Sequence, residues 1–328
     1  MAPACHFGWF PDALLFLIMT DITTGVVPAT LVPADTHLTV HHDLDVRHSL
    51  KNAEVDWDAC VPEAYWEINY RTLRNDDQSI LQAVGGFFSR HFQNLPRVHL
   101  LRALDVGSGA NLYPALAMLP WSAMITLTDP SAPNVAWLRT AAAGVSAMDE
   151  RDRWVWAPFW AECARYPAYQ QVRDPRAELA NRHEVRQQGV LQLAPEQWDL
   201  GTMFFVAESS TSDEGEFRAA TAAFLAALVP GAPFAAAFMD SSVGYVVADQ
   251  SYPAVRTVNV PMVRELLSQF SPDAVVFRVD VPVHDPARDG YEGMIVAVGT
   301  TSPLPGAAGT DRGHPSAGSR TRIALPIE

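Results

Sequence analysis

The residues that most clearly suggest chemistry lie in a glycine-rich stretch, LDVGSGANLYP, at Leu104–Pro114. An apolar run leads into its two glycines, and a helical pattern starts directly after them. Glycine lets the backbone approach a ligand without a Cβ clash, and open α/β sheets bind ligands beyond the carboxyl ends of their strands. Asp129 ends the next apolar run, where its carboxylate can accept both hydroxyls of an adenosine ribose. The stretch therefore predicts an adenosine-binding loop rather than a turn that binds nothing.

Two kinds of adenosine cofactor use such a loop, and one position separates them. The dinucleotide fingerprint GxGxxG/A needs a small third residue so that the helix can pack closely around a pyrophosphate. This chain has Leu112 at that position. S-adenosylmethionine carries no phosphate and does not need the small residue. The loop therefore favours S-adenosylmethionine, and a nucleotide oxidoreductase ranks behind it.

Further segments extend the pattern from Pro62 to Gly299. They read PEAYWEINY at residues 62–70, DVGSGANLY at the glycine loop, TDPSAPNVAWL from residue 128 and HEV at residues 183–185. Together these segments resemble the class I methyltransferases and, more narrowly, the nicotinamide, phenylethanolamine and indolethylamine N-methyltransferase family. The resemblance implies methyl transfer from S-adenosylmethionine to a small-molecule acceptor.

The resemblance also implies which residues bind the cofactor. Two tyrosines of the N-terminal segment are expected to close over it, and Asp129 and Asn134 keep the family's spacing at the ribose. Glu184 replaces the family's usual aspartate beside the adenine, and Phe204 stands where the family can have a threonine. The expected cofactor-binding residues are Tyr65, Tyr70, Gly107, Ser108, Gly109, Tyr113, Asp129, Asn134, Glu184, Val185 and Phe204.

Three acids match substrate-side positions of the same family and are the expected catalytic residues. Glu208 follows the predicted strand Trp198–Ala207, Asp240 follows the predicted strand Pro233–Met239, and Asp289 lies in the loop sequence DGYEG. An amine must lose its proton before it can attack, and a carboxylate can orient the ammonium form and accept that proton. Each acid also has a structural alternative, such as a first-turn helix position for Glu208 or a capping role for Asp240.

Strands must alternate with helices to bring these residues together. Such alternation predicts a Rossmann-like, doubly wound, mostly parallel α/β sheet, with an antiparallel edge strand formed by the last two strands and an N-terminal helical lid at about residues 55–95. Residues 151–188 are polar and irregular, and we expect a helix there. Strands are expected at Val98–Val106, Ile125–Asp129, Trp198–Ala207, Pro233–Met239, Ala274–Val281 and Gly293–Gly299, and helices within Pro62–Phe92 and at Leu112–Leu119, Ala132–Ala143, Phe217–Leu228 and Val260–Phe270.

Composition bounds the remaining possibilities. The 328 residues are 48% hydrophobic and carry a net charge of −14, so a large core can form and nucleic acid is not expected as the partner. Cys5, Cys60 and Cys163 form no CxxC pair, so neither a disulfide framework nor a metal site is expected. We expect a cytoplasmic protein that binds no membrane and is a monomer or a weak homo-oligomer. Residues 1–50 are expected to be a poorly ordered extension, 51–300 the methyltransferase domain, and 301–328 a disordered tail.

The sequence thus predicts an S-adenosylmethionine-dependent methyltransferase of a small molecule, acting most readily on an amine nitrogen. Two alternatives stay open. Fold and cofactor loop do not choose the acceptor atom, so transfer to oxygen or carbon fits the same residues. A non-catalytic cofactor-binding protein would keep Gly107, Gly109 and Asp129 without methylating an acceptor.

Overall fold

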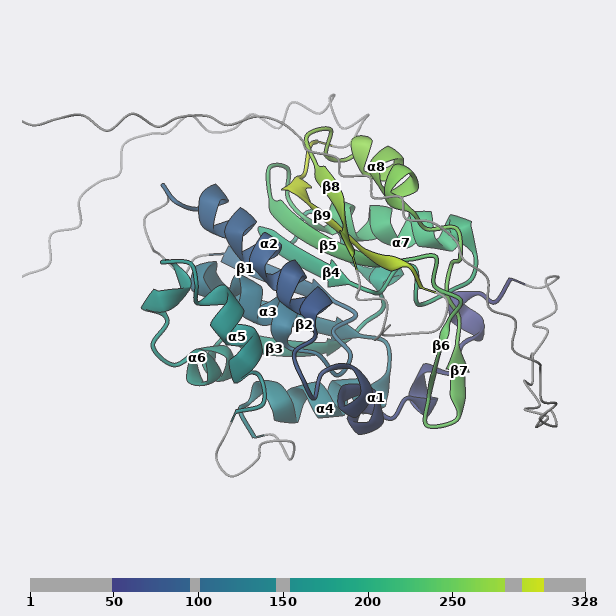
Figure 1. Ribbon diagram of the computed structural model, residues 1–328, viewed down its shortest axis with the longest axis horizontal. Coiled ribbons are helices and arrows are strands. Elements are labelled where there is room, and N and C mark those ends of the chain that lie inside the picture. The colour runs from purple at the N-terminus through teal and green to yellow at the C-terminus, as the bar shows by residue number, and fades with distance from the viewer. Residues whose placement is uncertain (1–48, 95–100, 146–153, 281–290, 304–328) are drawn as a thin grey trace, which may run out of the picture. The chain divides into compact units, whose positions relative to one another are not determined.

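The structure, a computed structural model, describes residues 49–94, 101–145, 154–280 and 291–303 (Figure 1). Its centre is a seven-stranded sheet in the order β3-β2-β1-β4-β5-β9-β8, and β6 and β7 form a separate hairpin. The strands are β1 Leu101–Val106, β2 Ser122–Asp129, β3 His183–Gln187, β4 Leu200–Phe204, β5 Pro233–Asp240, β6 Tyr245–Val247, β7 Gln250–Tyr252, β8 Val275–Asp280 and β9 Gly293–Thr300.

The direction of the strands confirms the predicted fold class. Strands β1 to β5 pair in parallel, whereas β9 pairs antiparallel with both β5 and β8. The reversed strand therefore lies one position inside the sheet, and β8 forms the edge. This order places β1, the first strand along the chain, at the centre of the sheet. The strand order reverses there, and doubly wound folds bind ligands at that point.

Helices flank the sheet on both faces (Figure 1). Several begin at a residue whose side chain caps the first turn: Ser131 accepts a hydrogen bond from the Asn134 N–H at 3.3 Å, and Asp213 accepts one from the Glu216 N–H at 2.9 Å. The helices are α1 Pro62–Asn69, α2 Asn75–His91, α3 Tyr113–Met118, α4 Ala132–Ala142, α5 Ala157–Cys163, α6 Pro175–Asn181, α7 Glu214–Ala227 and α8 Val260–Ser268.

Two hydrophobic cores lie on opposite faces of the sheet, because successive strand residues point to opposite sides. Along β1, Ala103 belongs to the first core, with α2 and α3, whereas Leu104 and Val106 belong to the second, with α7 and α8. The sheet is buried on both faces, which is typical of parallel sheets. It therefore holds the carboxyl ends of its strands in fixed positions.

The structure adds elements that were not expected. Residues 154–187 contain two helices, α5 and α6, and also β3, which the single expected helix left out. The β6–β7 hairpin was not expected either. Of the N-terminal segment, helix α2 packs into the first core, where Ile80, Leu81 and Val84 are fully buried.

Two further observations concern the ends and the surface. Thr301 continues the packing of β9, because its N–H donates to Ala232 O at 2.9 Å and its carbonyl accepts from the Gly231 N–H at 2.7 Å. The expectations for residues 1–48 and 304–328 lie outside the described residues. Within the described ranges, every helix is too short or too polar to cross a membrane.

Candidate functional site

A cavity of about 310 Å³ lies at the carboxyl ends of the central strands. The loop after β1, the end of β2 and the end of β4 form its floor, and the chain before α2 and the β6–β7 hairpin form its other walls. Its lining includes eight of the eleven expected cofactor-binding residues: Tyr65, Tyr70, Gly107, Ser108, Gly109, Asp129, Asn134 and Phe204.

The glycine loop has the backbone conformation that only glycine adopts easily. Gly107 has φ +59° and Gly109 has φ +54°. A Cβ on Gly107 would lie 2.7 Å from Cγ2 of Val206, so the loop approaches the chain after β4 too closely for any side chain. Ser108 fixes the turn, because its N–H donates to Thr128 O at 2.8 Å. The backbone of the loop is thus exposed to the cavity.

Asp129 is the acid of this cavity, and protein donors already hold it. Its Oδ2 accepts the Gly109 N–H at 2.9 Å, and its Oδ1 accepts the Ser131 N–H at 2.9 Å and the Asn134 amide at 3.1 Å. A carboxylate has about four acceptor positions, so one remains on Oδ2 for a ligand hydroxyl. Burial raises the pKa of Asp129 to about 6, although these hydrogen bonds act in the opposite direction.

Aromatic rings gather at the other end of the cavity. Tyr245 stacks on Tyr252 with ring centroids 4.9 Å apart, and Tyr252 stacks on Trp57 at 5.8 Å. Tyr65 meets Tyr245 edge-on at 6.0 Å and Tyr70 at 5.9 Å. All five rings line the cavity. They come from the chain before α2 and from the hairpin, so two distant segments build one aromatic wall.

Phe205 and two serines lie near this wall. Phe205 follows β4 with φ +60°, a conformation that is costly for a residue with a bulky side chain. Its N–H donates to Ala237 O at 2.7 Å, which fixes the bend. Ser209 and Ser210 line the cavity one turn further along. Backbone strain of this kind is concentrated at functional sites.

Of the residues expected beside the adenine, Glu184 and Val185 do not line the cavity. Strand β3 holds Glu184 against Thr126, whose hydroxyl donates to Oε1 at 2.7 Å, and against Arg186. Residues Gly189, Val190, Leu191 and Gln192, in the loop that follows β3, do line the cavity. The HEV motif therefore marks the strand that leads to this part of the cavity wall.

Tyr113 also lies outside the lining. It is fully buried, and its hydroxyl donates to Oδ1 of Asp77 at 2.9 Å. Its ring meets Tyr70 edge-on with centroids 5.8 Å apart. Tyr113 therefore supports a cavity residue from behind, which the glycine-loop motif alone did not reveal.

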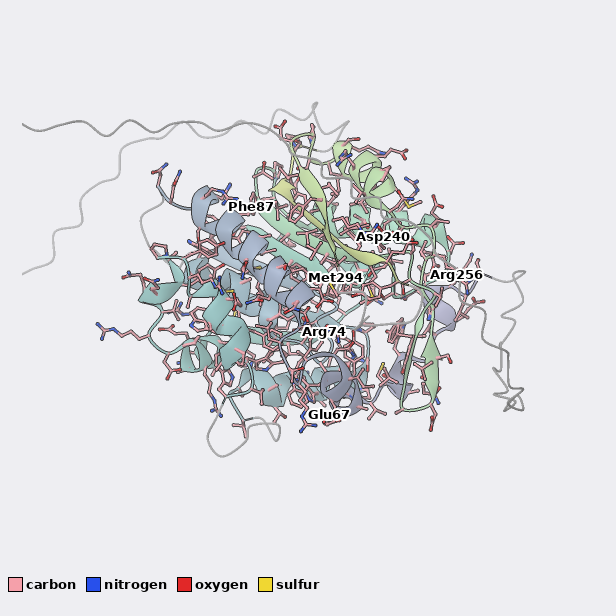
Figure 2. The ribbon with its side chains drawn as sticks, viewed as in Figure 1. Glu67, Arg74, Phe87, Asp240, Arg256 and Met294 are labelled. Atoms are coloured by element: carbon pink, nitrogen blue, oxygen red, sulfur yellow. The ribbon has the colours of Figure 1, made fainter. Side chains whose placement is uncertain are left out.

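The structure describes two of the three expected catalytic acids, and neither of them lines the cavity. Glu208 is fully buried, and its Oε1 accepts the Met239 N–H at 3.0 Å. Asp240, labelled in Figure 2 at the end of β5, accepts the Ser241 hydroxyl at 2.8 Å and pairs with Arg278 at 3.4 Å. Asp289 lies outside the described residues. Residue type and strand position predicted Glu208 and Asp240, but they did not determine which side chains line the cavity.

Several lining residues had no sequence signal that pointed to the site. Asn52, Trp57, Cys60 and Val61 precede α1, and they reach the cavity only because the chain there crosses the ends of the strands. Desolvation raises the pKa of the Cys60 thiol. Among the residues that the structure describes, no cluster of histidine, cysteine, aspartate and glutamate side chains is placed to hold a metal ion.

Comparisons with known proteins give structural but not sequence relatives. Neither a protein-family model nor a curated protein matches the chain. A solved structure of 1,6-didemethyltoxoflavin-N1-methyltransferase from Burkholderia thailandensis, with bound 1,6-didemethyltoxoflavin and S-adenosylhomocysteine, has 16% identity and a TM-score of 0.40, over 76% of this chain and 94% of that one. A SAM-dependent methyltransferase from Methanosarcina mazei has 12% identity and a TM-score of 0.41, over 66% and 98%. A 16S rRNA methyltransferase from T. thermophilus, in complex with AdoMet and guanosine, has 14% identity and a TM-score of 0.37, over 71% and 41%.

Proposed function

We propose that the protein transfers a methyl group from S-adenosylmethionine to a small molecule. Asp129 carries this proposal. It is a buried carboxylate at the end of β2 that lines the cavity beside the glycine loop, and its three protein donors leave one acceptor position for a ligand. A ribose hydroxyl is a donor of matching size for that position, and Asn134 beside it offers an amide.

The loop geometry supports an adenosyl compound without a pyrophosphate. Leu112, at the third position of the fingerprint, is fully buried, and α3 begins directly after it at Tyr113. A small residue there would let the helix approach a pyrophosphate closely, and leucine does not. Residues 189–192 and Pro130 line the part of the cavity next to Asp129, where we place the adenine.

When bound, S-adenosylmethionine supplies an electrophilic methyl group on a positively charged sulfur. The chain must hold that charge and align the acceptor with it. Tyr65 and Tyr70 line the cavity between the glycine loop and the hairpin, and aromatic faces attract a cation by about 0.5–2 kcal/mol each. Alignment of the two reactants can itself contribute about 7–11 kcal/mol.

The acceptor would then lie against the aromatic wall formed with the hairpin. Phe205, Tyr245 and Tyr252 line that part, together with Ser209 and Ser210. Nitrogen is the acceptor atom that we propose, on the strength of the sequence resemblance. Glu208 and Asp240 are expected to support the walls rather than to take the proton, since their oxygens bind Met239, Ser241 and Arg278.

Calorimetric titration tests the cofactor, and labelled methyl transfer tests the reaction. S-adenosylhomocysteine is expected to bind in the micromolar range or tighter, and NADH is expected not to bind. Incubation with S-adenosylmethionine carrying a deuterated methyl group, over a panel of amines, phenols and ring nitrogen compounds, is expected to give a labelled N-methyl product by mass spectrometry. The absence of binding by either adenosyl compound would overturn the proposal, and binding without transfer to any acceptor would leave a cofactor-binding protein.

A further inference from the structure

Residues 49–61 form a strap along the cavity, and hydrogen bonds hold this strap at two ends. The first end is bound to the loop between β4 and α7. The Leu50 N–H donates to the Ser212 hydroxyl at 2.6 Å, and the Ser212 N–H donates to Leu50 O at 2.8 Å. The Asn52 N–H donates to Oε2 of Glu216 at 2.8 Å, and the Asn52 amide donates to Ser210 O at 3.2 Å. Several hydrogen bonds therefore hold this end.

The second end is bound to the first turn of α4, beside the ribose acid. Oδ1 of Asp58 accepts the Ala132 N–H at 2.8 Å. The preceding N–H, of Ser131, donates to Asp129 at 2.9 Å. One helix N-terminus thus binds two carboxylates, one from the strap and one from the cavity. Asp58 is exposed, so water can replace its contact more easily than it can replace the set at the first end.

Between the two ends, side chains of the strap form part of the cavity wall. Trp57 stacks on Tyr252 of the hairpin, and Cys60 and Val61 line the cavity. A ligand held by Asp129 would lie in the same cavity as these residues. Movement of the strap would therefore widen the access of a ligand to the cavity and speed its release.

We propose that the strap opens at the contact between Asp58 and the Ala132 N–H, and that Asp58 is a positioning residue which retains the bound ligand. Beside this contact the Cys60 thiol also hydrogen-bonds the side chains of Ser131 and Tyr252. Opening is therefore a lifting of residues 57–60 between two fixed points, the hydrogen bonds at Ser212 and Glu216 and the start of α1. Only the identity of the ligand, an adenosyl compound, rests on the proposed function.

Cys60 reports the opening directly, because it belongs to the strap, lines the cavity and follows Asp58 closely. The experiment measures the rate at which N-ethylmaleimide modifies Cys60 in the ligand-free full chain carrying Cys5→Ser, with the fully buried Cys163 as internal reference. Asp58→Ala is expected to raise this rate by about threefold to tenfold, the size of effect found when a helix N-terminus loses its side-chain partner. Asp58→Asn keeps an acceptor oxygen and is expected to give an intermediate rate. Glu63→Ala removes another exposed acid close to the strap and is the matched control, with no change expected.

A second measurement connects the strap to the ligand. Asp58→Ala is expected to raise the dissociation rate of S-adenosylhomocysteine by a similar factor without lowering the association rate, whereas damage to the pocket itself would lower both affinity and association. Equal modification rates in Asp58→Ala and Glu63→Ala would overturn the strap proposal. Faster Cys60 modification in a protein that binds no adenosyl compound would retain the strap and reject the proposed ligand.

Discussion

Asp129 shows at the scale of one residue how burial and hydrogen bonds oppose each other. Three protein donors favour its charged form, and loss of water disfavours it more strongly, so that the pKa rises to about 6. The carboxylate is therefore charged near neutral pH but loses that charge under mild acid. The hydroxyl-accepting role that we propose for it should depend on both its charge and its position.

Asp129→Asn is expected to lower the affinity for S-adenosylhomocysteine by about tenfold to a hundredfold, because a charge-assisted hydrogen bond is lost and an amide donor faces the Gly109 N–H. Calorimetric titration checks this value. Asp199→Asn removes a carboxylate that pairs with Arg102 at the opposite ends of the strands, and it should leave the affinity unchanged. Equal affinities for the two variants would show that Asp129 does not bind the ligand.

The affinity of the wild-type protein is expected to fall as the pH drops below about 6, where Asp129 takes up a proton. Stability responds in the opposite direction. Because the folded pKa lies above the ordinary value of 3.8, the contribution of Asp129 to stability is present at low pH and is lost as the pH rises through about 6. Titrations between pH 5 and 8 should show this loss of affinity in the wild type and a flat profile in Asp129→Asn. A flat wild-type profile would contradict the assignment.

The β6–β7 hairpin shows how one small element completes the site. It contributes Tyr245 and Tyr252 to the aromatic wall, and its turn places Ala248 and Asp249 at positive φ. Gly244, with φ +111°, leads into β6 so closely that an added Cβ would lie 2.6 Å from Tyr252 O. The position of both tyrosines therefore depends on the absence of a side chain at residue 244.

Gly244→Ala is expected to reduce methyl transfer to an acceptor by about tenfold or more, since the hairpin must shift away from Tyr252 and misplace the acceptor. The affinity for S-adenosylhomocysteine should change by less than about threefold, because the residues that hold the adenosyl group lie elsewhere. Gly231→Ala is the matched control, as Gly231 has φ +83° but no atom within 4 Å of an added Cβ. Equal loss of activity in both variants would indicate a general effect of backbone strain.

Buried carboxyl groups set the pH response of the molecule as a whole. Burial raises the pKa of Asp77, on α2, and of Asp105, on β1, to about 7 in each case. The Oδ2 atom of each has no hydrogen-bond partner in the described part of the chain. Both groups bind a proton in the folded state at pH values where the unfolded chain has already released it. Their contribution to the free energy of unfolding is therefore lost as the pH rises from about 4 to about 7.

Asp77→Asn and Asp105→Asn are each expected to make this profile less steep by removing the share of one carboxyl group, and to stabilise the protein at pH 8 by about 2 kcal/mol. Urea unfolding at a series of pH values measures the effect. Glu67→Gln, at the exposed residue labelled on α1 in Figure 2, changes a carboxyl group on the surface and should leave the profile unchanged. A wild-type stability that rises from pH 5 to 8, with no change in either aspartate variant, would show that these groups are charged in the folded protein.

Local patterns in the sequence determined most of the sheet and the glycine loop. Apolar strands, glycine turns and helix caps act over a few neighbouring residues, so these patterns alone placed Gly107, Gly109 and Asp129 at the carboxyl edge of the sheet. The edge strand β3 was not expected, because its residues are polar and only half-buried and lack an apolar run. The sequence pattern also could not predict which partners the side chains near the strand ends would find. Glu208 binds the Met239 N–H, and Asp240 pairs with Arg278.

Only the tertiary structure decided which distant segments share the cavity. Trp57, Tyr65 and Tyr252 meet there although almost 200 residues separate the first from the last. No local propensity encodes such a contact, because it depends on strand order, on the hydrogen bonds that lead the strap across the sheet edge and on the bend at Gly244. The sequence by itself thus determined the fold and the acid beside the loop, while long-range packing decided what surrounds them.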